Sequence, residues 1–190
     1  MSVKWTLFGL CGMSVKLQAQ SELTMVALMP ILKTGIVASE VEKSLLQRGF
    51  VLKPGVSTAK DRLFQGHVDS GLVQLTMRKV SKKGSVWRYR VVFVSNQSTW
   101  LQKKADFEQK LLQLNSVLET NPSNTTKTLP QYCAGKEAQC FKDGISKYQS
   151  SWYWNNAVQR IKTVELKINS NYETVIEITD NAQETHHQLN

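Results

Sequence analysis

Apolar and polar residues alternate along three consecutive runs in the middle of the chain. The runs read RLFQGHV (62–68), LVQLTMRKV (72–80) and VWRYRVVFV (86–94). Such alternation is typical of strands that bury one face, because successive side chains point to opposite faces of a sheet. The last two runs are joined by SKKGS, in which Gly84 can adopt a positive φ, so the pattern predicts a hairpin.

The alternation also assigns the side chains of this hairpin to two faces. The apolar face takes Val73, Leu75, Met77, Trp87, Tyr89, Val91 and Phe93. The opposite face takes Gln74, Thr76, Arg78, Arg88 and Arg90. We therefore expect one face to form the core and the other to be solvated and basic.

Two segments have helical spacing. Ser39 and Glu42 match a capping box at the start of a helix over 39–48, which Gly49 can end in the left-handed conformation. Ser98 and Thr99 offer a cap for a longer helix over 99–118. Its apolar residues recur at helical intervals: Phe107, Leu111, Leu114 and Leu118. This stripe predicts that the longer helix covers the core face of the sheet.

The flanking segments add further strands. LTMVALMPIL (23–32) predicts a short strand before a turn, and the polar run TNPSNTTKTLPQY (120–132) predicts a long surface connection. SSWYW (150–154) predicts a strand, while KTVELKI (162–168) and YETVIEIT (172–179) predict a closing hairpin.

These elements predict an α+β fold: an antiparallel sheet with a long helix packed on one face and a short N-terminal helix. A parallel sheet is disfavoured because the connection within 72–94 is too short for a crossover. We expect five parts along the chain. They are a signal peptide over 1–19, an αβββα unit over 20–119, a linker over 120–149, C-terminal strands over 150–182 that extend the same sheet or form a second small one, and a flexible tail over 183–190.

The N-terminal residues have the pattern of a secretion signal. Lys4 precedes the apolar run WTLFGLCGMSV (5–15), which is too short for a transmembrane helix. Ala19 is a small residue suited to cleavage, so Gln20 would begin the mature chain. The alternative is that residues 5–15 form a core strand or helix. We expect export, with a periplasmic or secreted product and no membrane span.

The cysteines agree with export. Cleavage would remove Cys11 and leave Cys133 and Cys140 in the segment CAGKEAQC. In an oxidising compartment this spacing predicts a disulfide, whereas in a reducing compartment free thiols are expected. A zinc site is disfavoured because two ligands do not fill a tetrahedral shell and no histidine is near.

Composition indicates a folded, basic protein. Hydrophobic residues make up 41% of the 190 residues and charged residues 21%, which are ordinary globular values. The 24 Lys and Arg against 15 Asp and Glu give a net charge of +9. An excess of this size indicates an anionic partner, such as an acidic protein, an anionic glycan or nucleic acid. No particular oligomeric state is indicated.

The residues of a catalytic site do not come together in the sequence. The three histidines are His67 in a strand and His186 and His187 near the end, and the 10 glycines form no phosphate-binding loop. Asp61 and Asp69 flank the strand that carries His67 and could pair with it, although charges at strand ends are usually solvated. We therefore predict a non-enzymatic protein with no cofactor and no metal.

The basic sheet face is the main candidate binding surface. Arg78, Arg88 and Arg90, with Gln74 beside them, could meet across the hairpin and hold a carboxylate, sulfate or phosphate. The alternative, that these charges only keep the exposed face soluble, stays equally open. The expected function is an exported binding or inhibitory module, and the second possibility is a binder of an anionic polymer, acidic glycan or nucleic acid.

Aromatic residues suggest two further sites, and both are disfavoured. Trp87 and Tyr89 alternate with arginines, but they are assigned to the apolar face, so base stacking is unfavourable and nucleic acid is the less expected ligand. Trp152 and Trp154 share one face of a strand and could form a sugar platform, although a core position is the commoner use of such residues.

The order of three segments resembles a group of uncharacterised exported proteins of Bacteroidetes-type bacteria. The segments are MPILKTGIVASEVEKSLLQRGFVL, RLFQGHVDSGLVQLTMRKV and WRYRVVFVSNQSTWLQKKADFEQKLLQL, which together span residues 29 to about 118. In that group a Lys-Tyr-Gly commonly ends the second helix, whereas this chain has NSVLETNPS. The resemblance implies an α+β fold and export, and it implies no activity.

Overall fold

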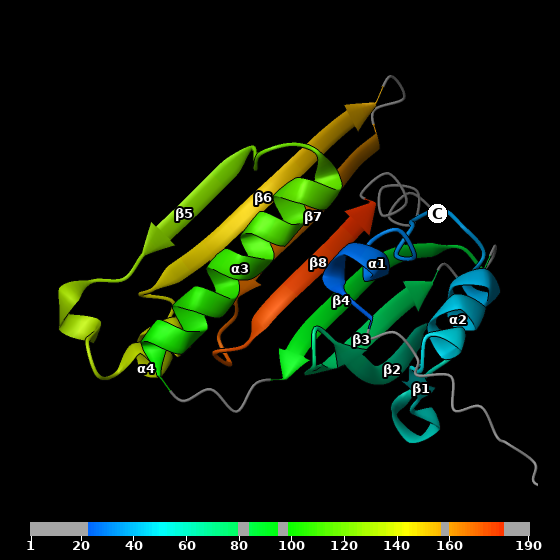
Figure 1. The fold of residues 1–190 in the computed structure, drawn as a ribbon, viewed down its shortest axis with the longest axis horizontal. Helices are drawn as coiled ribbons and strands as arrows, with labels where there is room; N and C mark the ends of the chain where they lie inside the picture. The colour runs from blue at the N-terminus through cyan, green and yellow to red at the C-terminus, as the bar shows by residue number, and fades with distance from the viewer. Residues whose placement is uncertain (1–22, 80–83, 95–98, 157–159, 181–190) are drawn as a thin grey trace, which may run out of the picture.

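All eight strands of the structure belong to one antiparallel sheet. The structure is a computed structural model that describes residues 23–79, 84–94, 99–156 and 160–180. The strands are β1 (Val51–Leu52), β2 (Asp61–Val68), β3 (Gly71–Lys79), β4 (Val86–Val94), β5 (Asn124–Thr128), β6 (Lys147–Asn156), β7 (Arg160–Ile168) and β8 (Thr174–Asp180). Their order across the sheet is β1-β2-β3-β4-β8-β7-β6-β5 (Figure 1). The predicted α+β class with an antiparallel sheet is therefore confirmed.

The helices are short except for one. They are α1 (Met25–Leu28), α2 (Ala38–Gln47), α3 (Trp100–Leu118) and α4 (Glu137–Lys142), with the 3-10 turns η1 (Pro54–Val56) and η2 (Gln131–Cys133). α3 contacts α1, β7 and β8, and Figure 1 shows it running in front of the C-terminal strands. Phe107 and Leu114 of α3 are fully buried in the same core cluster as Leu166 and Ile176 of β7 and β8.

The sheet consists of two halves with the same connectivity. In the N-terminal half α2 is followed by the antiparallel strands β1 to β4, and in the C-terminal half α3 is followed by β5 to β8. A turn or short helix lies between the first and second strands of each half, η1 in one and η2 with α4 in the other. The last strands of the halves, β4 and β8, pair along the middle of the sheet. The C-terminal strands thus extend the main sheet, the first of the two arrangements considered from the sequence.

The predicted helix over 39–48 is present, but its capping box is not. α2 begins at Ala38 after Val37, and no side chain caps it. Val37 forms a bridge with Ser85, and the Ala38 N–H donates to the Gly84 carbonyl at 2.9 Å. This pairing with the β3–β4 connection fixes the helix start one residue early, so Ser39 lies inside the helix.

Two predictions of secondary structure are wrong. Residues 23–32 contain α1 and not a strand, because the Thr24 Oγ1 accepts from the Ala27 N–H at 3.2 Å and Asp69 Oδ2 accepts from the Met25 N–H at 3.3 Å. The predicted surface connection over 120–132 contains β5, which pairs with β6. Its residues are mostly exposed, so no apolar alternation marks it.

The cysteine pair lies in the C-terminal half. Cys133 and Cys140 form a disulfide that joins η2 to α4, and both are buried. The Ser146 hydroxyl donates to the Cys133 Sγ at 3.7 Å. The bridge therefore closes the excursion between β5 and β6. The signal sequence and the tail after residue 180 that were predicted from the sequence lie outside the described residues.

Candidate functional site

A small pocket lies on the polar face of the sheet, where β3, β4 and β8 run side by side. It has a volume of about 250 Å³ and is lined by Thr76, Arg78, Arg88, Arg90 and Glu177. Pairing explains the gathering, because Arg78 lies opposite Arg88 and Thr76 opposite Arg90. Glu177 lies opposite Arg90 on the next strand. The structure thus brings together the three arginines predicted from the sequence; we call this the arginine pocket.

A β-bulge changes the expected position of one aromatic residue. Arg78 pairs with Arg88, but Lys79 pairs with Val86, so Trp87 is an extra residue on β4. Val86 is fully buried in the core, while Trp87 is only half-buried and lies near two guanidinium groups. The Arg78 and Arg88 Cζ atoms lie 6.0 and 5.2 Å from the Trp87 ring centre. The assignment of Trp87 to the apolar face is therefore wrong.

Two of the three arginines are held by carboxylates. Arg78 donates to Asp61 from Nε at 2.6 Å and from Nη2 at 3.0 Å, a bidentate pair between opposite residues of β2 and β3. The Arg90 Nε lies 3.5 Å from a Glu177 oxygen. Glu177 also accepts from Lys167 at 3.0 Å, and Lys167 contacts Glu165 at 3.2 Å. These pairs fix the walls of the pocket.

Arg88 differs from the other two arginines. Its Nε–H is buried, and within the described residues it has no hydrogen-bond partner. Three guanidinium groups are balanced here by the carboxylates of Asp61 and Glu177, which leaves one positive charge in excess. Like charges directly opposite each other on neighbouring strands are unfavourable, and a buried donor without an acceptor is costly. An anion in the pocket would relieve the repulsion between the guanidinium groups.

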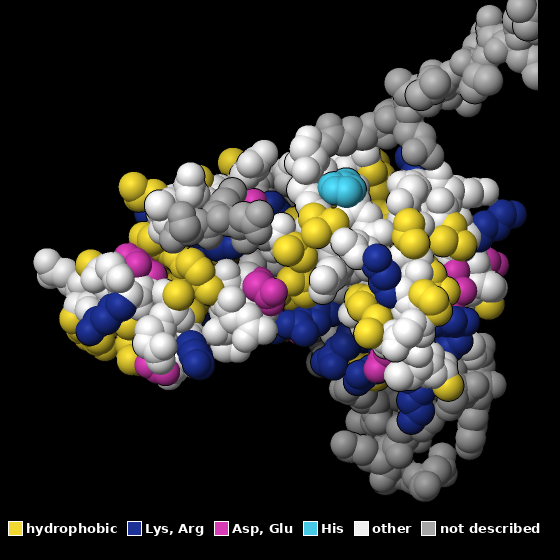
Figure 2. Space-filling view, turned by 90° about the horizontal axis from the view of Figure 1, so that it is seen from below, with side chains coloured by type: hydrophobic (Ala, Val, Ile, Leu, Met, Phe, Trp, Pro, Cys, Tyr) yellow, Lys and Arg dark blue, Asp and Glu magenta, His cyan; other side chains and the backbone are white. Residues whose placement is uncertain are grey.

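The side of the molecule seen from below is basic near its centre, with acidic groups interspersed. Figure 2 shows Lys and Arg side chains gathered near the centre of the view, with Asp and Glu side chains beside them. Such a mixed surface favours a defined anionic group over a continuous polyanion, since the carboxylates repel the rest of a polymer.

The other predicted binding residues lie elsewhere. Gln74 is exposed on β3, opposite Val92, and does not line the pocket. Trp152 is fully buried, and its Nε1 donates to the Thr120 carbonyl at 3.2 Å. Trp154 is partly buried against the core. The buried Trp152 ring is not available for an exposed sugar platform, whereas Trp154 is only partly buried.

The acidic residues that flank β2 have structural partners. Asp61 pairs with Arg78, and Asp69 accepts from the Met25 N–H and from the Gln113 Nε2 at 3.2 Å. His67 is exposed. In the described part of the chain, no group of three or more His, Cys, Asp or Glu side chains is placed to hold a metal ion.

Buried charges on α3 were missed by reasoning from the sequence. Lys103 and Lys110 are buried where the helical period would place apolar residues. Lys110 forms an ion pair with Asp106, whose other oxygen accepts from the Thr174 hydroxyl at 2.8 Å. Burial lowers the pKa of the Lys103 ammonium, with the neighbouring Lys110 acting in the same direction. The i,i+4 spacing of Asp106 and Lys110 is the one signal in the sequence that could have indicated this pair.

Comparison with known proteins gives no family for this chain: it matches no family model, no curated protein and no solved structure. Among the described helices, none has the length and apolar character needed to cross a membrane.

Proposed function

We propose that this chain is an exported, non-enzymatic binding module that holds a single anionic group of a partner in the arginine pocket. The observation that carries the proposal is the gathering of Arg78, Arg88 and Arg90 around one pocket with only two carboxylates, which leaves one positive charge in excess. The anionic group is a carboxylate, sulfate or phosphate, since the planar guanidinium donors match these oxygens.

The architecture supports this proposal. α3 packs against β7 and β8, and in this proposal the partner approaches the polar face on which the arginine pocket lies. Asp61 and Glu177 hold Arg78 and Arg90 in place, so the site is preorganised and little side-chain entropy is lost on binding. The same carboxylates disfavour the anionic-polymer alternative, because they leave one uncompensated positive charge for several phosphates or sulfates to share.

Export is the second part of the proposal. The disulfide between Cys133 and Cys140 supports it, since such bridges persist in oxidising compartments. We expect intact-mass analysis of protein from the producing cell's envelope or medium to place the N-terminus at Gln20. Protein retained in the cytosol with Met1 intact would contradict export and leave the pocket proposal standing.

The pocket is tested by titration with defined anions. A glutamate-containing peptide and a sulfated disaccharide would be titrated into the mature protein by calorimetry at low salt. Arg88→Gln should weaken binding of the preferred ligand at least about tenfold, which corresponds to one charge-assisted hydrogen bond. The matched control is Arg48→Gln, which removes the same charge from an exposed position at the end of α2.

The outcomes separate the alternatives. Normal binding by Arg88→Gln, or equal losses of affinity in Arg88→Gln and Arg48→Gln, would contradict binding in the arginine pocket. Affinity that grows steadily with oligosaccharide or oligonucleotide length, with a salt dependence that indicates many released counterions, would favour a polymer binder. Binding with a shallow salt dependence that is lost only in Arg88→Gln supports a discrete anion.

A further inference from the structure

A second and larger pocket lies on the other face of the sheet, at the C-terminal end of α3. Its volume is about 400 Å³. The walls come from the segment after α1, from the last turn of α3 and from β6 to β8. The apolar side chains that line it are Met29, Leu32, Val117, Trp154, Val164 and Ile178.

The pocket is a half-open cleft in the surface and not a void in the interior. Pockets of this size that are lined by apolar and aromatic side chains are typical of small-ligand sites. The apolar wall favours a hydrocarbon chain or ring as the ligand body.

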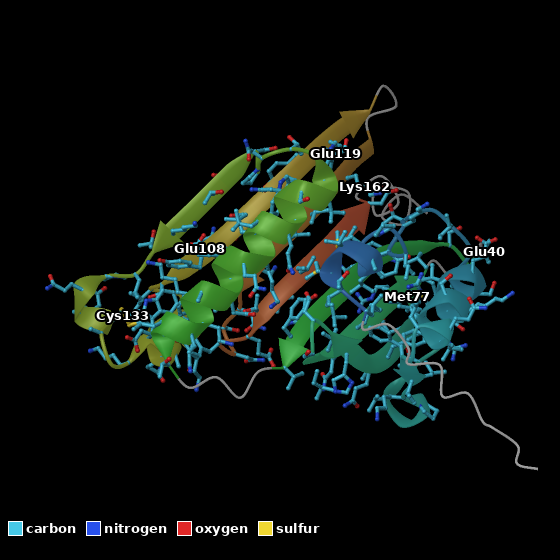
Figure 3. The ribbon with its side chains drawn as sticks, viewed as in Figure 1. Glu40, Met77, Glu108, Glu119, Cys133 and Lys162 are labelled. Carbon is cyan, nitrogen blue, oxygen red and sulfur yellow. A yellow bond between two sulfur atoms is a disulfide. The ribbon has the colours of Figure 1, made fainter. Side chains whose placement is uncertain are left out.

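The charged groups that line the pocket have one sign. They are Lys33 and Lys162, and no Asp or Glu is among the lining residues. Lys33 is exposed, and Lys162 lies directly opposite Asp180 of β8. Figure 3 shows Lys162 beside the end of α3, near Glu119. The two ammonium groups line the pocket next to its apolar wall, which favours a ligand whose polar end is negative.

The end of α3 acts against this charge, but only weakly. A helix C-terminus carries roughly half a negative charge on its free carbonyls, and α3 ends at Leu118, which lines the pocket. The carboxylates nearest to Lys162 are those of Asp180, opposite it on β8, and of Glu119 after α3, and neither lines the pocket. An anionic head is therefore favoured over a cationic one at the two lysines themselves.

We propose that this pocket binds a small amphiphile with a single anionic head, such as the carboxylate of a medium-chain fatty acid. The chain occupies the space between Trp154, Val117 and Ile178, and the head lies between the ammonium groups of Lys33 and Lys162. This site is separate from the arginine pocket, which lies on the opposite face of the sheet and has no residue in common with it.

Three ligands of equal chain length test the proposal: decanoate, decanol and decyltrimethylammonium, each below its micelle concentration. Calorimetry with the mature protein should show decanoate bound at least about tenfold more tightly than decanol, since an ion-paired head adds roughly 1.5 kcal/mol or more. The cationic amphiphile should bind weakest of the three. Equal affinity for decanoate and decyltrimethylammonium would overturn the assignment of the lysines.

Two variants locate the ligand. The double variant Lys33→Gln with Lys162→Gln should bind decanoate about tenfold or more weakly and decanol with unchanged affinity, because only the contact with the charged head is lost. The matched control is Lys104→Gln with Lys136→Gln, which removes the same charge from exposed positions outside the pocket. Equal loss in both double variants would show a nonspecific charge effect and overturn the site.

A substitution that fills the pocket tests whether the apolar part of the ligand binds there. Val117→Trp places a large ring into the pocket from the half-buried last turn of α3, and should abolish binding of both decanoate and decanol. Circular dichroism and thermal unfolding serve as the folding control, since an intact variant should keep the spectrum and melting temperature of the unmodified protein. Retained decanoate binding by Val117→Trp, or no binding of decanoate to the unmodified protein, would overturn the proposal.

Discussion

The guanidinium carbon of Arg88 lies 5.2 Å from the centre of the Trp87 ring, although the two residues are neighbours on one strand. Successive side chains of a regular strand point to opposite faces. The bulge at Lys79 and Val86 removes this constraint, and the Trp87 ring also lies near Arg78. One extra residue therefore supplies an aromatic contact to two arginines that would otherwise only repel each other.

Loss of this ring should cost measurable stability. We expect Trp87→Ala to lower the free energy of unfolding by about 1 to 2 kcal/mol, since two cation–π contacts of ~0.5 to 1 kcal/mol each are lost. Trp87→Phe should lose less, because a smaller aromatic face remains. Urea denaturation monitored by circular dichroism measures both. Equal stability of Trp87→Ala and the unmodified protein would show that the contacts contribute nothing.

The repulsion between Arg78 and Arg88 should appear in the salt dependence of stability. Arg88→Gln removes one of two like charges that lie directly opposite each other, so at low salt it should be as stable as the unmodified protein or more stable by up to ~1 kcal/mol. Denaturation would be measured at about 10 mM and at about 1 M salt. The higher concentration shortens the Debye length from about 30 to about 3 Å, so it should remove this difference in stability. A large destabilisation at both salt concentrations would mean that Arg88 has a structural role.

Gly66 of β2 leaves room for the buried ring of Phe50. A Cβ at this position would lie 2.7 Å from two atoms of that ring, which is too close for carbon atoms. Phe50 is 2% exposed and has little space to move. We expect Gly66→Ala to lower the free energy of unfolding by about 1 to 3 kcal/mol, the usual cost of overpacking a core.

A double variant separates this clash from a general effect of strand substitution. Phe50→Leu in the Gly66→Ala background should recover part of the loss, because the shorter side chain vacates the space. Thermal unfolding of the two single variants and the double variant gives the coupling energy. Strictly additive losses would show that the two positions do not interact.

Tyr89 should make the protein less stable at high pH. Its buried hydroxyl donates to the Lys33 carbonyl at 2.6 Å, and burial raises its pKa far above the ordinary value of about 10. The folded protein then keeps this proton when the unfolded chain loses it. The contribution of Tyr89 is complete below pH 10 and decreases above it, by at most about 1.4 kcal/mol per pH unit.

Comparison with Tyr89→Phe isolates this group. At pH 7 the variant should be less stable by about 1 kcal/mol, because the Lys33 carbonyl loses its donor. Above pH 10 the difference should shrink, since the phenylalanine does not titrate. Guanidinium denaturation between pH 7 and 11 measures it. A constant difference over this range would contradict the raised pKa.

The disulfide should stabilise one region more than the whole sheet. For a closed loop of about eight residues, the chain-entropy relation gives about 2.5 kcal/mol. We expect Cys133→Ser with Cys140→Ser to lose hydrogen-exchange protection first in η2 and α4, which the bridge joins. The amides of β4 and β8 serve as the internal control. Equal loss of protection in β4 and β8 would show that the bridge supports the entire fold.

Alternation predicted the strands of the N-terminal half well because one face of each is buried. The strands at 61–68, 71–79 and 86–94 differ from the predicted runs by at most one residue at either end. α1 was not predicted, because a short apolar run does not distinguish a strand from a helix and one of its caps, Asp69, is distant in sequence. β5 was missed because an exposed edge strand has no apolar face to reveal it.

The candidate site was predictable only in part. Arg78 and Arg88 could be placed together from the hairpin, since both lie on adjacent strands. The acidic partners of Arg78 and Arg90 depend on a strand register that the local pattern does not give: Asp61 comes from β2 and Glu177 from β8, the last described strand. The position of Trp87 depends on the bulge, which no periodicity indicates. The pocket at the end of α3 joins segments that are far apart in sequence, so only one of its lining residues, Trp154, was considered from the sequence.

The division of the sheet into two equivalent halves bears on how such a chain could arise. Each half is one helix followed by four antiparallel strands, and each ends in a strand whose outer edge pairs only with that of the other half. Two separate copies of one such unit could pair in the same way, as a symmetric dimer with a continuous sheet. The connectivity is therefore that of a dimer joined into one polypeptide. After such a fusion the two copies diverge independently, which leaves one half free to carry arginines on the shared face while the other acquires a disulfide.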